Sequence, residues 1–182
     1  MAGGLNLYGY ANGDPLNNSD PFGLCAMCLG AAAGAALATA PLPQTINPDG
    51  YVLSNPAVRL NVMKLYVALD RESGNPGFEF RVTGGDRYQH TSTYNSANGG
   101  TRTLVEIRSR TNGSVVSGSS RTSPHLESRG ARAVDLRING VSPAIVDEAI
   151  KNSTAFSPAN TARDYPDAPH THVALPPGKP AP

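Results

Sequence analysis

Two of the four histidines in the chain stand two residues apart, as His170-Thr171-His172. Apolar residues alternate with them, which predicts a β-strand. Because side chains on a strand alternate between its faces, both imidazole rings should point to the same side. Such a pair can share one metal ion, or one ring can bind a metal while the other moves a proton. Paired histidines also occur on surfaces by chance, so the pair needs further ligands.

A third histidine and a carboxylate complete a candidate ligand set. His125 precedes Asp135, and Asp135 lies in an expected strand in which Val134 and Leu136 face the other way. Imidazole nitrogens and a carboxylate oxygen suit a three-ligand zinc site that leaves a fourth position open for water. For Asp135 taken alone, the alternative is a salt bridge to an arginine.

Two further side chains have the chemistry to assist at such a site. Arg87 ends the sequence TGGDR, where a predicted strand runs into a double-glycine turn. Its guanidinium fork can hold a carboxylate or an oxyanion. Asp167 lies three residues before His170, and a carboxylate beside a metal site can take a proton from water. The simpler alternatives are a surface turn around Arg87 and a turn-forming aspartate at position 167.

The elements that must position these residues can be read from the apolar pattern. One helix begins at Pro56 and ends by Gly74, and a second begins at Pro143. Their apolar residues recur at helical spacing: Val58, Val62, Leu65 and Leu69 in the first, and Ile145, Val146, Ala149 and Ile150 in the second.

Alternation of period two predicts the strands. These are 78–82, 105–107 with a hairpin turn at Asn112-Gly113 leading to 115–116, 134–138 and 170–175. The order is helix, strand, hairpin, strand, helix, strand. It predicts an α+β fold, with one small antiparallel sheet and helices packed on one side.

Length and charge set limits on the function. The chain has 182 residues and a net charge of +1, so it lacks the overall positive charge typical of a nucleic-acid-binding protein. All 15 basic residues lie in residues 51–182 with 11 acidic ones, so that part carries +4.

Residues 1–50 differ in composition from the rest of the chain. Residues 25–40 carry no charge, end before Pro41 and are short of the ~20 residues that span a bilayer. This composition predicts a segment that is packed inside the protein, a segment that contacts a membrane, or a flexible linker. Cys25 and Cys28 form a lone CxxC, which is too few ligands for a zinc ribbon, and we interpret them as small apolar residues.

The N-terminal sequence resembles the end of an Rhs (YD-repeat) core. The match rests on Gly4-Leu5-Asn6-Leu7-Tyr8 followed by Asp20-Pro21-Phe22-Gly23-Leu24. In that family a DPxGL signature ends a β-shell, and a variable toxin follows it. The resemblance implies self-cleavage after Leu24 assisted by Asp14 and Asp20. It divides the chain into a core end (1–24), an apolar and proline-rich linker (25–50), a toxin domain (51–176) and a proline-rich tail (177–182).

The toxin domain resembles the zinc D-Ala-D-Ala peptidases and their hedgehog-like relatives. The shared order is TGGDR, then SPH and GARAVD, then D-x-x-H-x-H, over roughly residues 55–176. The resemblance implies a hedgehog/DD-peptidase-like fold. It implies zinc ligands at His125 and Asp135, an Arg87 that orients substrate or stabilises the oxyanion, and a Ser123 that contacts substrate or a ligand.

Two departures from that family concern the ligands. Nine residues separate His125 from Asp135 where the family has six, so the connecting loop must bulge outward to preserve the site. The last ligand can be His170, with Asp167 as base, or His172, with His170 assisting. We favour His172, because the sequence stays strand-like beyond it, and keep Asp167 and His170 as the proton-handling candidates.

Together the resemblances imply a secreted zinc peptidase toxin. Its substrate would be the peptides of bacterial peptidoglycan, cut in the stem or crosslink within the periplasm of a target cell. Type VI secretion components, an Rhs shell and a cognate immunity protein would be its partners, with no nucleic acid among them. The alternatives are a zinc-dependent nuclease toxin, for which only Arg129, Arg132 and Arg137 gather near Asp135, and an inactive zinc-binding adhesion module.

Overall fold

The computed structural model describes residues 40–73, 78–157 and 170–177. The fold is α+β, as predicted. The helices are α2 (Pro56–Ser73), α3 (Pro143–Ser153) and the short 3-10 helix η2 (Glu127–Arg129). The strands are β1 (Glu79–Gly84), β2 (Arg87–Asn95), β3 (Thr101–Ser109), β4 (Ala133–Asn139) and β5 (Thr171–Ala174).

Both helices begin where their capping residues predict. The Asn55 side-chain oxygen accepts a hydrogen bond from the Ala57 backbone N–H at 2.9 Å, and α2 starts between them at a proline. The Ser142 hydroxyl caps α3, which also starts at a proline. The predicted apolar stripe of α2 is confirmed, because Val58, Val62, Leu65 and Leu69 are all fully buried.

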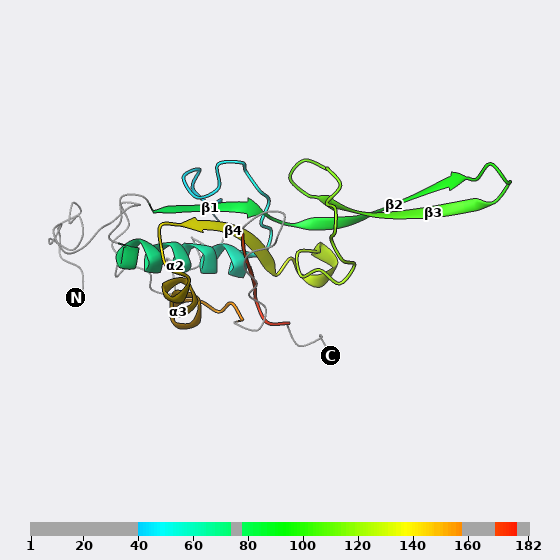
Figure 1. Cartoon of the computed structure of the whole chain (residues 1–182). Helices are drawn as coiled ribbons and strands as arrows, with labels where there is room; N and C mark the ends of the chain where they lie inside the picture. Colours follow the sequence, from blue (N-terminus) through cyan, green and yellow to red (C-terminus); the bar gives the residue numbers. More distant parts are fainter. Residues whose placement is uncertain (1–39, 74–77, 158–169, 178–182) are drawn as a thin grey trace, which may run out of the picture. The chain divides into compact units, whose positions relative to one another are not determined.

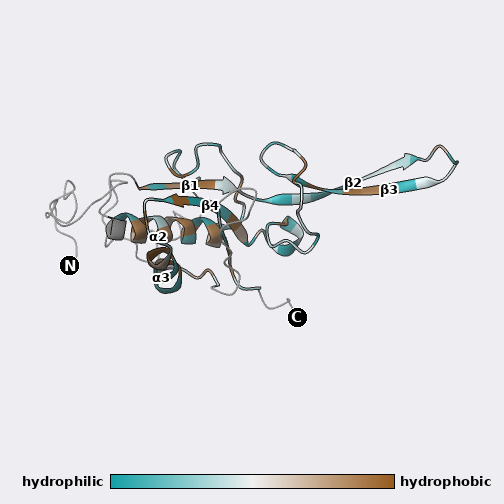
Figure 2. Ribbon diagram, viewed as in Figure 1, coloured by the Kyte–Doolittle hydropathy of each residue, from teal (hydrophilic) through white to brown (hydrophobic). Residues whose placement is uncertain are grey.

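Strands β1, β4 and β5 form an antiparallel sheet with β4 in the centre. The helices lie on one side of it (Figure 1). Helix α2 packs on the sheet through Tyr66, whose ring meets that of Phe80 edge-on at 5.5 Å, and α3 packs on α2. Hydrophobic and hydrophilic colours alternate along β1 and β4, the strands that lie beside α2 (Figure 2).

The two faces of this sheet carry different kinds of side chain. Leu136 lies opposite Val82 on β1, and Val134 lies opposite Val173 on β5. All four side chains are fully buried. Because strand side chains alternate, Asp135 must project from the face opposite to these apolar residues. The helices therefore cover one face, and the other is left for polar side chains.

The hairpin differs from its prediction. Strand β3 pairs along its whole length with β2, through a turn at residues 96–100, and forms a second, two-stranded sheet. Val115 makes only an isolated bridge to Arg108, so the Asn112-Gly113 turn closes no full strand pair. Strand β2 escaped prediction because its sequence, RYQHTSTYN, has no buried face to produce an apolar alternation.

Two boundaries also shift. Ile46, ahead of the expected domain start at residue 51, is fully buried, and its carbonyl accepts a hydrogen bond from the Val82 N–H at 2.7 Å. Strand β5 begins at Thr171, so His170 lies immediately before the strand instead of within it.

Candidate metal centre

Asp135 is the centre of the site, and the sheet register decides its neighbours. On one side it lies opposite Gly84 of β1, and on the other opposite His172 of β5. Gly84 leaves the room that the carboxylate occupies, because a Cβ there would lie 2.5 Å from Asp135 Oδ2. Gly84 in TGGDR is therefore required by contact with the ligand, whereas a Cβ at Gly85 would lie too close to the Val52 carbonyl oxygen.

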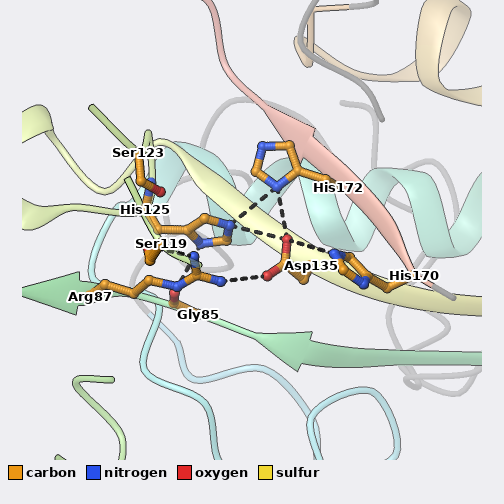
Figure 3. A network of polar contacts seen from close by, with 8 residues as sticks. All are labelled: Gly85, Arg87, Ser119, Ser123, His125, Asp135, His170 and His172. Carbon is orange, nitrogen blue, oxygen red and sulfur yellow. Dashed lines mark hydrogen bonds and ion pairs between the residues drawn. The ribbon is translucent and has the colours of Figure 1, made fainter. Parts of the chain in front are cut away.

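Three candidate donor atoms, one of them on Asp135 itself, lie close together (Figure 3). His125 Nε2 lies 3.1 Å and His172 Nδ1 2.8 Å from Asp135 Oδ1, and the two nitrogens are 3.2 Å apart. Donors about 2.0–2.1 Å from a tetrahedral zinc ion lie about 3.3 Å from one another. The spacing therefore fits a single small cation, and the group His125, Asp135 and His172 can hold a metal ion.

The hydrogen bond on the far side of the His125 ring sets its tautomer. Nδ1 lies 2.9 Å from the Gly85 carbonyl oxygen, which can only accept, so the ring donates from Nδ1. Nε2 then faces Asp135 with a lone pair. A hydrogen on His172 Nδ1, or a metal ion between the three atoms, satisfies these acceptors. A histidine ligand oriented through its other nitrogen is a regular feature of metal sites.

Burial and pairing favour the charge states that a metal needs. Burial lowers the pKa of His125, although Asp135 acts in the opposite direction, so the neutral imidazole is favoured. Burial alone would raise the pKa of Asp135, but its contacts with His125 and His172 hold that pKa well below its ordinary value. A neutral histidine and an ionised aspartate are the ligand forms that bind metals.

Arg87 binds the second oxygen, Oδ2, of the Asp135 carboxylate. Its Nη2 donates to Asp135 Oδ2 at 2.9 Å, and its Nη1 donates to the Ser119 hydroxyl at 3.1 Å. The carboxylate thus turns Oδ1 toward the histidines and Oδ2 toward the guanidinium. The alternative stated for Asp135, a salt bridge to an arginine, is thus present beside the ligand group, and its partner is Arg87. The sequence did not identify that partner and missed Ser119, which lies in a serine-rich loop without a distinguishing signal.

The longer connection between His125 and Asp135 is accommodated at the surface. Residues 127–129 form η2, and Ser128 and Arg129 are exposed. Gly130 and Ala131 then adopt left-handed backbone conformations with φ of 83° and 45°, and the chain returns to β4. This connection therefore runs along the surface of the domain between His125 and Asp135.

The remaining predicted site residues have different positions. His170 Nε2 lies 3.7 Å from Asp135 Oδ1, beside the ligand group but farther out than His172. The Ser123 hydroxyl accepts a long hydrogen bond of 3.4 Å from the His125 backbone N–H and so helps to shape the ligand loop. Asp167, the predicted cleavage residues Asp14, Asp20 and Leu24, and the apolar segment 25–40 lie outside the described residues.

Comparisons with known proteins give no relative. No protein-family model, no curated protein and no solved structure matches the chain. Among the described residues, none of the helices has the length and apolar character needed to cross a bilayer. The function must therefore be argued from the geometry of the site and from the sequence resemblances.

Proposed function

We propose that the chain is a zinc-dependent peptidase toxin that hydrolyses amide bonds in the stem peptides or crosslinks of bacterial peptidoglycan. The convergence of His125, Asp135 and His172 carries this proposal. Catalytic zinc sites use three protein ligands and keep a fourth position open, whereas structural sites use four. The described residues supply three, in the order of the zinc D-Ala-D-Ala peptidases that the sequence resembles.

The chain's own side chains supply the rest of the chemistry. A zinc ion held by His125, Asp135 and His172 would act as a Lewis acid toward the scissile carbonyl and would lower the pKa of water. His170, beside the ligand group, takes a proton from the attacking water and returns it to the leaving amine. Asp167 remains the second candidate for this role.

Arg87 has two tasks in the proposal. It fixes the Asp135 carboxylate through Oδ2, and its positive charge lies close enough to the ligands to attract the carboxylate of a stem peptide or steady an oxyanion. Ser123 helps to hold the loop that carries His125, and in this proposal it also contacts substrate or a ligand.

The N-terminal resemblance supplies the biological setting of the proposal. Residues 1–24 would end an Rhs core that is cut after Leu24, with Asp14 and Asp20 assisting. The toxin would reach the periplasm of a target cell through a type VI secretion system, and an immunity protein would protect the producer.

The direct test is digestion of purified peptidoglycan by the full chain with one equivalent of zinc. Mass spectrometry should detect newly freed amino groups in the stem or crosslink peptides. Adding EDTA, or replacing Asp135 with alanine, should remove them. Undigested peptidoglycan with a zinc-loaded, folded protein would contradict the proposal.

A second test separates the peptidase from a nuclease by compartment. Peptidoglycan lies outside the inner membrane, so the chain should kill a Gram-negative cell when fused to a secretory signal and be nearly harmless without one. The Asp135→Ala variant should be harmless in both places. Killing from the cytoplasm with loss of DNA or RNA would favour the nuclease alternative.

A further inference from the structure

The ribbon of β2 and β3 projects past the three-stranded sheet (Figure 1). Its two faces differ in composition. On the first face, which we call the charged face, lie three pairs with charged or aromatic members and one pair without them: Tyr88–Arg108, His90–Glu106 and Tyr94–Arg102, and Ser92–Leu104. On the other lie uncharged pairs, which we call the threonine face: Gln89–Ile107, Thr91–Val105, Thr93–Thr103 and Asn95–Thr101.

The threonine face is continuous with the metal centre. Arg87, the first residue of β2, shares the parity of Thr91 and Thr93 and contacts Asp135 with its side chain. At about 3.4 Å per residue, Thr93 lies about 20 Å and Asn95 about 27 Å along the strand from Arg87. A short peptide held at the metal centre would not reach these residues, but a polymer would.

The chemistry of this face selects its ligand. Gln89, Thr91, Thr93 and Thr103 are exposed, and they offer hydroxyl and amide groups without a charge. A polyanion is bound mainly through lysine and arginine. Arg102 and Arg108 lie on the charged face, and Arg87, at the start of the threonine face, is paired with Asp135. A protein partner favours aromatic and arginine anchors, and Tyr94 and Arg102 also lie on the charged face. Uncharged hydrogen-bonding groups match a neutral polymer that carries hydroxyl and acetamido groups.

We propose that the threonine face of the ribbon binds the glycan strand of peptidoglycan while an attached stem peptide enters the metal centre. The inference rests on the proposed function, because it assigns a second contact to the same substrate. The ribbon would then select peptides that are still attached to polymer over free peptides.

The test removes the hydroxyls and keeps the strand. The triple variant Thr91→Val, Thr93→Val and Thr103→Val retains β-branched side chains, and Ser92→Val on the charged face is its matched control. Full chains are compared for kcat/KM on intact sacculi and on a soluble stem peptide. The triple variant should lose about tenfold on sacculi, roughly a factor of two for each of three hydrogen bonds, and less than twofold on the peptide. The Ser92→Val control should match the wild type on both.

A binding measurement tests the glycan contact without catalysis. The inactive Asp135→Ala chain should cosediment with glycan strands whose peptides an amidase has removed. Introducing the three valine substitutions into the same chain should abolish this binding. A second variant, Thr93→Glu with Thr103→Lys, keeps the ribbon folded through an opposite-charge pair across the strands. It should lose binding as the valine variant does.

The outcomes separate the two proposals. If the wild type cleaves both substrates and the triple variant is unchanged on sacculi, the ribbon inference is overturned and the peptidase stands. If the wild type cleaves neither but the Asp135→Ala chain binds stripped glycan, the peptidase fails and the glycan contact stands. An equal loss on sacculi and on the soluble peptide assigns the threonines to the metal centre or to the fold and overturns the inference.

Discussion

Strands β4 and β2 each carry a residue of the candidate metal centre, but their surroundings are opposite. Strand β4 lies between two others, and its first four residues, which include Asp135, are buried. Strand β2 has a single partner, and of its residues only Arg87 is shown in contact with the ligand group. The comparison shows that packing on both sides fixes a ligand in place, whereas most side chains of the ribbon stay exposed or half-buried.

The largest expected effect removes one ligand from the buried sheet. His172→Ala should lower zinc affinity by more than about 100-fold, which exceeds the ~10–100-fold typical of residues that only support a ligand. His170→Ala should lower it by less than about tenfold, because His170 lies farther from Asp135. Competition against a chromophoric chelator measures both constants. Equal losses would make His170 a ligand as well.

The energetic difference between sheet and ribbon can be measured with two leucines. Leu136 on β4 is fully buried and Leu104 on β3 is 45% exposed. Leu136→Ala should reduce the free energy of unfolding by about 2–5 kcal/mol, and Leu104→Ala by about 0.5 kcal/mol or less. Urea denaturation of the full chain gives both values. A large loss at Leu104 would mean that the ribbon is packed against another part of the chain.

A third comparison uses two glycines. A Cβ at Gly84 would displace the Asp135 carboxylate, whereas one at Gly100, in the ribbon turn, meets nothing within 4 Å. Gly84→Ala should lower zinc affinity by about 10–100-fold while circular dichroism stays unchanged. Gly100→Ala should leave the affinity as it is. An unchanged affinity in Gly84→Ala would show that Asp135 can bind from another position.

The smallest effect concerns Asp86, between the sheet and the ribbon. The side chain is buried, and Oδ2 accepts a hydrogen bond from the Ser54 N–H at 2.6 Å, while Oδ1 has no partner among the described residues. Burial raises the pKa of Asp86 above its ordinary value of 3.8. A carboxyl with a raised pKa stabilises the folded state below the unfolded pKa and loses that contribution as pH rises through the folded pKa.

Asp86→Asn removes this titration, so its stability relative to the wild type should increase as pH rises from about 4 toward neutrality. Urea denaturation at several pH values, in the presence of chelator, measures the difference. Asp147→Asn, an exposed aspartate on α3, controls for the loss of one negative charge. A pH-independent difference would show that Asp86 titrates normally.

Much of the fold could be predicted where one side of an element is buried. The stripe of α2 and the alternation of β1 and β4 follow from packing against a common core, and the structure confirms both. Strand β2 could not be predicted in this way, because neither of its faces packs over most of its length. The pairing of β3 with β2 is a long-range choice that the local Asn112-Gly113 turn signal did not reveal.

The amino-acid sequence by itself determined which residues have ligand chemistry, since residue type, alternation and order single out His125, Asp135, His170 and His172. Only the tertiary structure decided how they meet. The register of β4 against β5 sets His172 opposite Asp135, Gly84 leaves space for the carboxylate, and the Gly85 carbonyl orients His125. These are contacts between residues far apart in the chain, and hydrogen bonds and steric exclusion between such residues arise only when the sheet has formed.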